Sequence, residues 1–129
     1  MKKKIVITGG AGFVGSNMIS LLLAKTKFSI VSIDNYSTGS IKNHVKDKRV
    51  DYIKSDTKNI AKILKKNKNN IHSLFHFGEF SRIYQSFLKM SECISSNSIG
   101  TNEVFNFCLK NQIKLIYSAT SATIGNSGN

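Results

Sequence analysis

Three glycines and one aspartate have the residue types and the spacing needed to hold a dinucleotide. Gly9, Gly12 and Gly15 follow a β-branched run at residues 4–8 and precede a segment with helical periodicity. In such a turn, the first glycine permits the tight bend and the second lets main-chain N–H groups approach a pyrophosphate. The third allows close packing of helix against strand, and the helix N-terminus offers free N–H donors to the phosphates. A purely structural turn would not need three glycines in register with an acidic residue.

Asp34 is the acidic residue that completes this pattern. It stands 25 positions after Gly9, at the end of the next apolar run. A carboxylate at that place accepts hydrogen bonds from both hydroxyls of a ribose and repels a 2′-phosphate. No arginine stands beside Asp34 to reverse that preference, although Lys42 and Lys46 follow. We therefore expect NAD rather than NADP as the cofactor.

The elements that must position these residues alternate along the chain. Apolar, β-branched runs predict strands, and apolar residues at intervals of three and four predict helices. The expected strands are 4–8, 28–33, 50–54, 72–77 and 113–118. The expected helices are one of about 12 residues that ends near 25–27, one at 57–66, and one at 80–109 with a break near 95–98. The polar stretch up to residue 48 is expected to be a mobile loop.

This alternation predicts an α/β fold. We expect a doubly wound parallel sheet, the Rossmann fold, with five strands in the order 3-2-1-4-5 and helices on both faces. The order reverses between strands one and four, so ligands are expected at the carboxyl ends of those two strands. A chain of 129 residues is long enough for one domain, and no repeat or linker divides it. We assign residues 1–129 to a single NAD-binding domain, with no substrate domain in this chain.

Composition restricts which partners and which cellular compartment are expected for this protein. The formal net charge is +12, but the basic residues are almost all scattered lysines, so we expect no nucleic-acid partner. No apolar run approaches the roughly 20 residues of a membrane span, and no cleavable leader pattern is present, which predicts a cytoplasmic protein. Cys93 and Cys108 have apolar neighbours and are expected to be buried, reduced thiols. His44 and His72 are expected at the surface or at a strand end and His76 within a strand, without metal-ligand spacing, so we expect no metal.

Further motifs lie at the ends of the expected strands. They are Thr8–Gly15 in the form T-G-x-x-G-x-x-G, Asp34-Asn35 followed by Ser37-Thr38-Gly39, Asp56, Phe75-His76-Phe77-Gly78, Asn97–Thr101 in the form N-x-x-G-T, and Ser118–Gly125. With these motifs the chain resembles the extended short-chain dehydrogenase/reductase family, specifically its NAD-dependent sugar-nucleotide epimerases and dehydratases, such as UDP-galactose 4-epimerases. The resemblance extends over essentially all 129 residues.

The resemblance implies a cofactor site and one catalytic hydroxyl. The segment from Asp34 would hold the adenosine, Asp56 would contact the adenine amino group, and residues 75–78 would pass under the nicotinamide side. Counting back from Gly125, the catalytic hydroxyl falls on Thr120. The residues implied to contact NAD are Gly9, Gly12, Phe13, Val14, Gly15, Asp34, Asn35, Ser37, Thr38, Gly39, Asp56, Thr57, Phe77, Gly78, Glu79, Ser81, Asn97 and Ser118.

The resemblance also implies a reaction on a nucleotide-sugar. NAD takes a hydride from a sugar carbon, and the keto intermediate is reduced again on its other face or eliminates water. The family's general base is a tyrosine in a Y-x-x-x-K motif. None of the four tyrosines here has a lysine four residues later, and in the family pattern that pair would follow Asn129. We therefore expect residues 1–129 to bind NAD without turning over a nucleotide-sugar by themselves.

The segment after the fourth expected strand departs from the family pattern at two positions. Ser81 stands where many 4-epimerases have a lysine. The usual F-H-x-A-A or F-H-x-A-G is replaced by Phe77-Gly78-Glu79, which places a carboxylate close to the cofactor. Glu79 is either a solvated acid at a helix N-terminus or a contact to the substrate.

Apolar side chains before and after Asn97 are assigned mainly to the core. They are Ile83, Phe87 and Met90 before it, and Val104, Phe105, Cys108 and Leu109 after it. In the family the equivalent helices form the four-helix bundle of a dimer, so an exposed part of this stripe is expected to be a homodimer interface.

Three interpretations of function remain. The first is the NAD-binding N-terminal part of a sugar-nucleotide epimerase or dehydratase, and the second is a stand-alone NAD-binding module without catalytic activity. The third is a basic nucleic-acid-binding protein on a Rossmann scaffold, which the scattered lysines disfavour. A reading frame that continues into Y-x-x-x-K would favour the first over the second.

Overall fold

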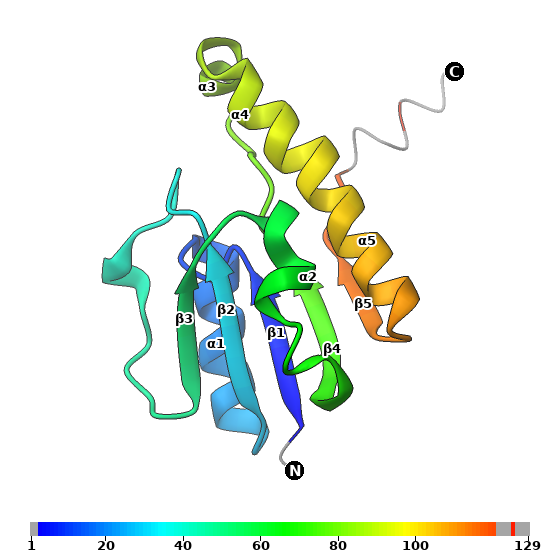
Figure 1. The fold of residues 1–129 in the computed structure, drawn as a ribbon. Coiled ribbons are helices and arrows are strands. Elements are labelled where there is room, and N and C mark those ends of the chain that lie inside the picture. Colours follow the sequence, from blue (N-terminus) through cyan, green and yellow to red (C-terminus); the bar gives the residue numbers. More distant parts are fainter. Residues whose placement is uncertain (1–2, 121–124, 126–129) are drawn as a thin grey trace.

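The structure, a computed structural model, describes residues 3–120 and residue 125. Its centre is a five-stranded, all-parallel sheet in the order β3-β2-β1-β4-β5, which confirms the predicted topology. The strands are β1 (Lys4–Thr8), β2 (Ser29–Asp34), β3 (Val50–Lys54), β4 (Ile71–His76) and β5 (Lys114–Tyr117). All five arrows point the same way in Figure 1, so their carboxyl ends line one edge of the sheet.

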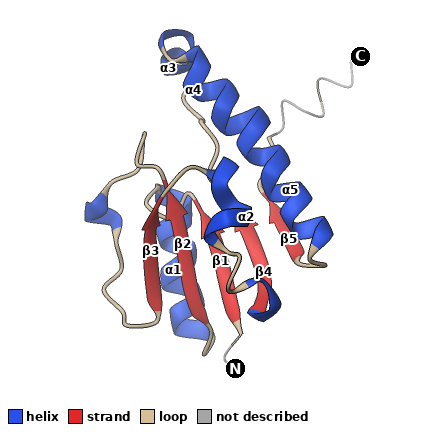
Figure 2. Cartoon of the chain, in the orientation of Figure 1, coloured by secondary structure: helices blue, strands red, loops and turns tan. Residues whose placement is uncertain are grey.

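Helices cover both faces of this sheet. In Figure 1, α1 (Phe13–Lys25) lies behind the sheet, whereas α2 (Ile60–Ile63) and α5 (Thr101–Lys110) lie in front of it. The cartoon in Figure 2 shows the α3 (Ile83–Leu88) and α4 (Met90–Ile94) region standing beyond the carboxyl edge. A π-helical segment, η4 (Ser95–Gly100), joins α4 to α5 as one rod. Three short 3₁₀ helices complete the described chain: η1 (Ile41–Asn43), η2 (Thr57–Asn59) and η3 (Lys68–Asn70).

The core has two parts because side chains alternate across the sheet. Val6, Val31 and Leu74 face the α2 and α5 side, where they join a cluster that includes Ile60 and Val104. On the other side, Ile5, Ile7 and Ile30 pack against Ile19 of α1. Burying each such side chain contributes about 1.5–3 kcal/mol. The apolar side chains of the strands therefore also provide the surfaces on which the helices pack.

Two predicted helices are broken in the structure. The helix expected at 57–66 is reduced to η2 and the four-residue α2, followed by turns. Like charges three and four residues apart, as at Lys62, Lys65 and Lys66, disfavour helix. The helix expected at 80–109 starts only at Ile83 and is also interrupted at Lys89, whereas η4 lies at the break expected near 95–98.

The assignment of the apolar stripe to the core was wrong for most of its members. Val104 and Cys108 are buried together with Phe107, which recurs at the same helical spacing on the face toward the sheet. Leu109 is 82% exposed and Phe105 43%, because their positions are rotated away from that face. The α3–α4 residues of the stripe are exposed as well: Ile83, Phe87 and Met90. Among the described residues, no helix has both the length and the apolar character needed to span a membrane.

The two cysteines differ in burial. Both are free thiols, but Cys108 is buried and Cys93 only half-buried, so the expectation of two buried thiols holds for Cys108 alone.

Candidate functional site

The glycine turn after β1 is wedged between two neighbouring strands. Gly9 has a φ of +74°, a conformation that glycine adopts without strain, and its N–H donates to the carbonyl of Ile33 over 2.8 Å. A Cβ at Gly9 would lie 2.7 Å from the carbonyl atoms of Phe77. The turn thus lies against β2 on one side and the end of β4 on the other, where the strand order reverses.

The first turn of α1 is left without side-chain caps. Gly12 is the N-cap residue, no side chain hydrogen-bonds the first N–H groups, and no acidic residue lies in this turn. A Cβ at Gly15 would overlap the carbonyl oxygen of Gly9, so close packing of helix on loop requires glycine there. Free N–H groups and the positive end of the helix dipole together form an anion site.

Asp34, the last residue of β2, is fixed beside this anion site. Its Oδ2 accepts a hydrogen bond of 2.9 Å from the N–H of Ala11, inside the glycine turn. Its Oδ1 accepts one of 2.8 Å from the N–H of Tyr36. A carboxylate has about four acceptor positions, so two remain for other donors. The sequence prediction that Asp34 ends the second strand is confirmed.

The segment after Asp34 folds back over the glycine turn. The side-chain Nδ2 of Asn35 donates to Asp56 Oδ1 over 2.9 Å, and the side-chain Oδ1 of Asn35 accepts from the main-chain N–H of Ser37. Farther along, the N–H of Ser40 and the side-chain amide of Asn43 both donate to the carbonyl of Ala11, at 3.0 and 2.8 Å.

A stacked aromatic pair braces the same segment. The rings of His44 and Tyr52 lie 3.7 Å apart and almost parallel. The stretch expected to be a mobile loop is therefore tied down at both ends, and His44 is half-buried rather than at the surface.

At the other end of the glycine turn, a hydrogen-bonded network runs from β1 to β5. His76 is fully buried, with Nδ1 at 2.6 Å from Thr8 Oγ1 and Nε2 at 2.8 Å from Thr101 Oγ1. Burial lowers the pKa of His76, so the ring is neutral. Thr101 donates to Glu79 Oε1 over 2.8 Å, and Tyr117 donates to the same oxygen over 2.9 Å. Donation to Glu79 raises the pKa of Tyr117.

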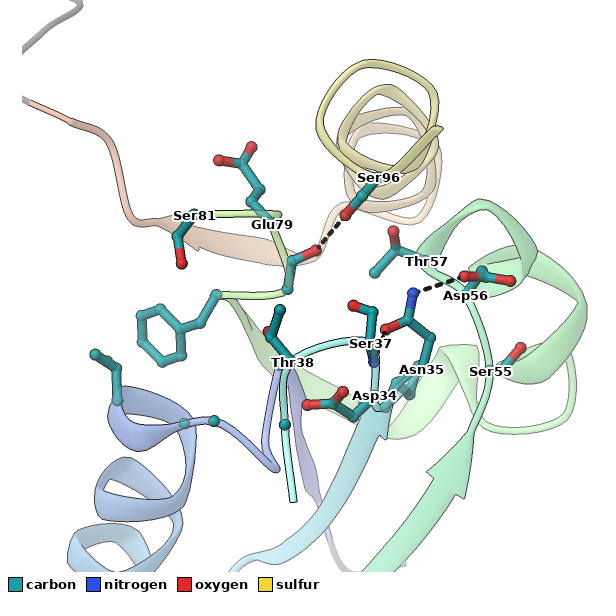
Figure 3. Close-up of a pocket in the computed structure, with 18 of the residues that line it drawn as sticks. Asp34, Asn35, Ser37, Thr38, Ser55, Asp56, Thr57, Glu79, Ser81 and Ser96 are labelled. Carbon is teal, nitrogen blue, oxygen red and sulfur yellow. Dashed lines mark hydrogen bonds between the residues drawn. The ribbon is translucent and has the colours of Figure 1, made fainter. Parts of the chain in front are cut away.

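The glycine turn, the segment after Asp34 and the residues after β4 line a cavity of about 260 Å³ at the carboxyl edge of the sheet. Figure 3 shows Ser55 and Asp56 on one side of it, Glu79 and Ser81 on the opposite side, and Asp34 below. Of the residues expected to contact a cofactor, those lining the cavity are Gly9, Gly12, Phe13, Val14, Gly15, Asp34, Asn35, Ser37, Thr38, Gly39, Asp56, Thr57, Phe77, Gly78, Glu79 and Ser81.

Three expected site residues do not line this cavity. Asn97 instead clamps the chain at Phe80, with its Oδ1 accepting from the main-chain N–H and its Nδ2 donating to the carbonyl at 2.9 Å. Ser118 follows β5, where its N–H donates to the carbonyl of His76. Thr120 lies just beyond it and is exposed. The later part of that motif, residues 121–124, lies outside the described residues.

Five lining residues were missed by the sequence analysis: Ile33, Ser55, Arg82, Ser95 and Ser96. Ile33, Ser55, Arg82 and Ser96 each adjoin a predicted site residue, so widening the motifs by one position would have included them. Ser96 donates to the carbonyl of Gly78 over 3.2 Å, a contact across 18 positions that no local pattern indicates.

The residues present fit a dinucleotide. Gly12 lines the cavity, and a Cβ there would meet only the carbonyl oxygen of Gly9, at 3.3 Å, so a larger side chain would extend into the cavity itself. An uncapped helix N-terminus suits a diphosphate, and a fixed carboxylate at the tip of β2 suits a ribose. A glycine turn, an acid after the second strand and a cavity at the switch point define the class of Rossmann nucleotide-binding domains.

Comparison with known proteins assigns the chain to a family within this class. The model of the NAD dependent epimerase/dehydratase family matches residues 5–129, and the chain belongs to this family, whose cofactor is the one expected from Asp34. It is 31% identical over 127 residues to the ADP-L-glycero-D-manno-heptose-6-epimerase of Brachyspira hyodysenteriae. It is also 31% identical over 134 residues to the UDP-N-acetyl-alpha-D-glucosaminuronate decarboxylase of Bacillus cytotoxicus.

The matches extend over nearly all of this chain but less than half of each relative. In both sequence comparisons they include 97% of this chain and 39% of the relative. A solved UDP-N-acetylglucosamine 4-epimerase from Methanobrevibacter ruminantium, in complex with UDP-N-acetylmuramic acid, superposes with a TM-score of 0.83 at 29% identity. That superposition includes 100% of this chain and 42% of the epimerase.

Proposed function

We propose that this chain binds NAD in the cavity at the carboxyl edge of its sheet. The adenosine lies at the β2–β3 side, against Asp34, Asn35 and Asp56, and the diphosphate lies on the main chain of Gly12 and the start of α1. The nicotinamide then lies on the β4–β5 side, because a dinucleotide crosses the sheet where the strand order reverses. The observation that carries this proposal is the Asp34 carboxylate, held on the Ala11 N–H beside an uncapped helix N-terminus.

Phe77, Gly78, Glu79 and Ser81 form the nicotinamide side of the proposed site. Two hydrogen bonds fix Gly78 in this segment. Its N–H donates to Thr8 Oγ1 over 3.1 Å, and its carbonyl oxygen accepts from the Ser96 hydroxyl. When bound, NAD supplies a reversible hydride acceptor for a substrate carbon. Ser118 and Thr120, just after β5, are proposed to lie near that carbon, with the Thr120 hydroxyl bonding a sugar hydroxyl.

Residues 1–129 are proposed to be the cofactor-binding domain of a sugar-nucleotide epimerase or dehydratase. Support comes from the family match and from the full-length likeness to part of a nucleotide-sugar epimerase. None of Tyr36, Tyr52, Tyr84 and Tyr117 is followed by a lysine four residues on, so the family's base is not among these residues. The proposal therefore predicts cofactor binding by these 129 residues without turnover of a nucleotide-sugar. A module that binds NAD without any catalytic role is the second candidate. It is favoured by the same observation, that no tyrosine among these residues has a lysine four positions later.

A second copy of the chain is the proposed partner of the exposed apolar stripe. Ile83 and Phe87 of α3 and Leu109 of α5 are each more than two-thirds exposed, which is unusual for large apolar side chains. Packing against the same helices of another copy would remove them from water.

Two measurements test the proposed function. Titration calorimetry of the purified protein with NAD is expected to show one saturable site per chain. Incubation of the NAD-loaded protein with UDP-glucose, UDP-N-acetylglucosamine or an ADP-heptose is expected to give no product. Absence of NAD binding would refute the site, and turnover of any of these nucleotide-sugars would refute the assignment of the base outside these residues.

A further inference from the structure

Glu79 is the least expected residue of the proposed site, because the family pattern has alanine or glycine there. Its side chain is 26% exposed and lies on the side of the cavity opposite Asp56 (Figure 3). Both Thr101 and Tyr117 donate to Oε1, at 2.8 and 2.9 Å. The carboxylate is therefore held by its surroundings rather than free to turn into solvent.

The direction of the buried hydrogen bonds supports this arrangement. Thr101 has a single hydroxyl proton, which it gives to Glu79, so its oxygen accepts from Nε2–H of His76. The ring is neutral, and its Nδ1 must then accept from the hydroxyl of Thr8. That hydroxyl oxygen in turn accepts from the N–H of Gly78. Every proton in the network is thus assigned, and the network ends on Glu79.

The charge of Glu79 is not neutralised by a neighbour. Among the described residues, the nearest basic group within 4 Å is His76 Nε2, at 3.9 Å, and His76 is neutral. Arg82 lines the same cavity, but it is exposed and forms no ion pair with Glu79. The nicotinamide side of the cavity therefore carries a fixed negative charge.

We propose that Glu79 makes this site prefer the oxidised cofactor. The inference rests on the proposed function, with the nicotinamide on the β4–β5 side. The oxidised ring is a pyridinium cation, whereas the ring of NADH is uncharged, so a carboxylate nearby stabilises NAD⁺ alone. For a pair about 4 Å apart that water screens almost fully, at an effective dielectric constant of about 80, the expected preference is about 3- to 10-fold. Glu79 is thereby a specificity-determining residue for the redox state of the bound cofactor.

The test compares the dissociation constants of NAD⁺ and NADH in the wild-type protein and three variants. Glu79→Gln keeps the shape and an acceptor for Thr101 and Tyr117 but removes the charge. Glu79→Asp keeps the charge but shortens the side chain by one methylene. Glu92→Gln removes a carboxylate from α4 that does not line the cavity and that forms an ion pair with Lys89 at 3.6 Å. NADH binding is followed by its fluorescence and NAD⁺ binding by calorimetry.

The expected result is that the ratio of the NADH to the NAD⁺ dissociation constant falls 3- to 10-fold in Glu79→Gln. The ratio is expected to stay within twofold of wild type in Glu79→Asp and Glu92→Gln. A ratio unchanged in Glu79→Gln overturns the inference and leaves the proposed function intact, whereas a wild-type protein that binds neither form refutes the proposed function itself. If Glu79→Gln does not fold, Glu79→Asp decides: loss of the preference with the charge retained overturns the inference.

Discussion

The carboxylate of Asp34 accepts a hydrogen bond of 2.9 Å from the N–H of Ala11, so the tip of β2 is tied to the middle of the glycine turn. The two parts of the proposed site, one for a ribose and one for a diphosphate, are therefore a single rigid unit. The following segment strengthens this unit, because Ser40 and Asn43 donate to the carbonyl of the same Ala11. The site is preorganised before any ligand arrives, which reduces the entropy that binding must overcome.

The first prediction concerns space at Gly12. Its φ of −84° and ψ of 176° are open to any residue, so Gly12→Val is compatible with the fold, at about 1 kcal/mol for a poorer N-cap. The valine side chain would lie where the diphosphate is proposed to rest, and NAD affinity is expected to fall at least 100-fold, with a smaller loss in Gly12→Ala. Calorimetry gives the affinity, and thermal unfolding without ligand reports the fold. A folded Gly12→Val that binds NAD as wild type does would contradict the proposed position of the diphosphate.

The second prediction is a pH dependence of stability that arises from His76. Burial lowers its folded-state pKa below the ordinary value of 6.5, so the unfolded chain binds a proton that the folded one does not. Stability is therefore expected to fall as the pH drops below about 6.5, with a slope of at most about 1.4 kcal/mol per pH unit from this group. Urea unfolding between pH 7.5 and 5 measures it.

Variants separate His76 from the other titrating groups. His76→Gln is expected to be less stable at pH 7.5 but to have a flatter profile, because the titrating group is gone. His72→Gln changes an exposed histidine on the same strand and is expected to keep the wild-type slope. Equal slopes in wild type and His76→Gln would show that this histidine does not titrate differently on unfolding.

The third prediction separates the two thiols. Burial raises the pKa of the Cys108 thiol to about 11, whereas Cys93 is only half-buried. Because the thiolate is the reactive form, a maleimide at pH 8 is expected to label one cysteine per native chain, and that cysteine is Cys93. Intact-mass measurement follows the reaction, with Cys93→Ser as the control that should label only after denaturation. Rapid labelling of native Cys93→Ser would mean that Cys108 is not protected by the core.

Much of this architecture could be predicted from the sequence, because its signals are local. The bounds of β1 and β3 match the expected runs residue for residue, and the strand order follows from alternation and right-handed crossovers. Asp34 could be placed because a strand end and an acid coincide there.

What could not be predicted depends on contacts between distant residues. The π-helical turn η4 brings Gly100 against Thr57, where a Cβ would overlap the threonine hydroxyl. The partners of His76 stand 68 and 25 positions away, so its expected place within a strand indicated no network. Phe105 and Leu109 were expected in the core but are exposed. Their apolar pattern did not indicate which part of the helix the sheet covers.

The fourth prediction bears on the central claim, that Asp34 holds the ribose of NAD. The measurement is the pair of dissociation constants for NAD and NADP in wild type and in Asp34→Ala, with Asp51→Ala as a control that removes an exposed carboxylate from β3. Losing charge-assisted hydrogen bonds of about 1.5–3 kcal/mol is expected to weaken NAD binding about 10- to 100-fold. Removing the charge is also expected to abolish the preference for NAD over NADP, whereas Asp51→Ala should retain both. An Asp34→Ala protein that keeps wild-type NAD affinity, or the same discrimination against NADP, would contradict the account.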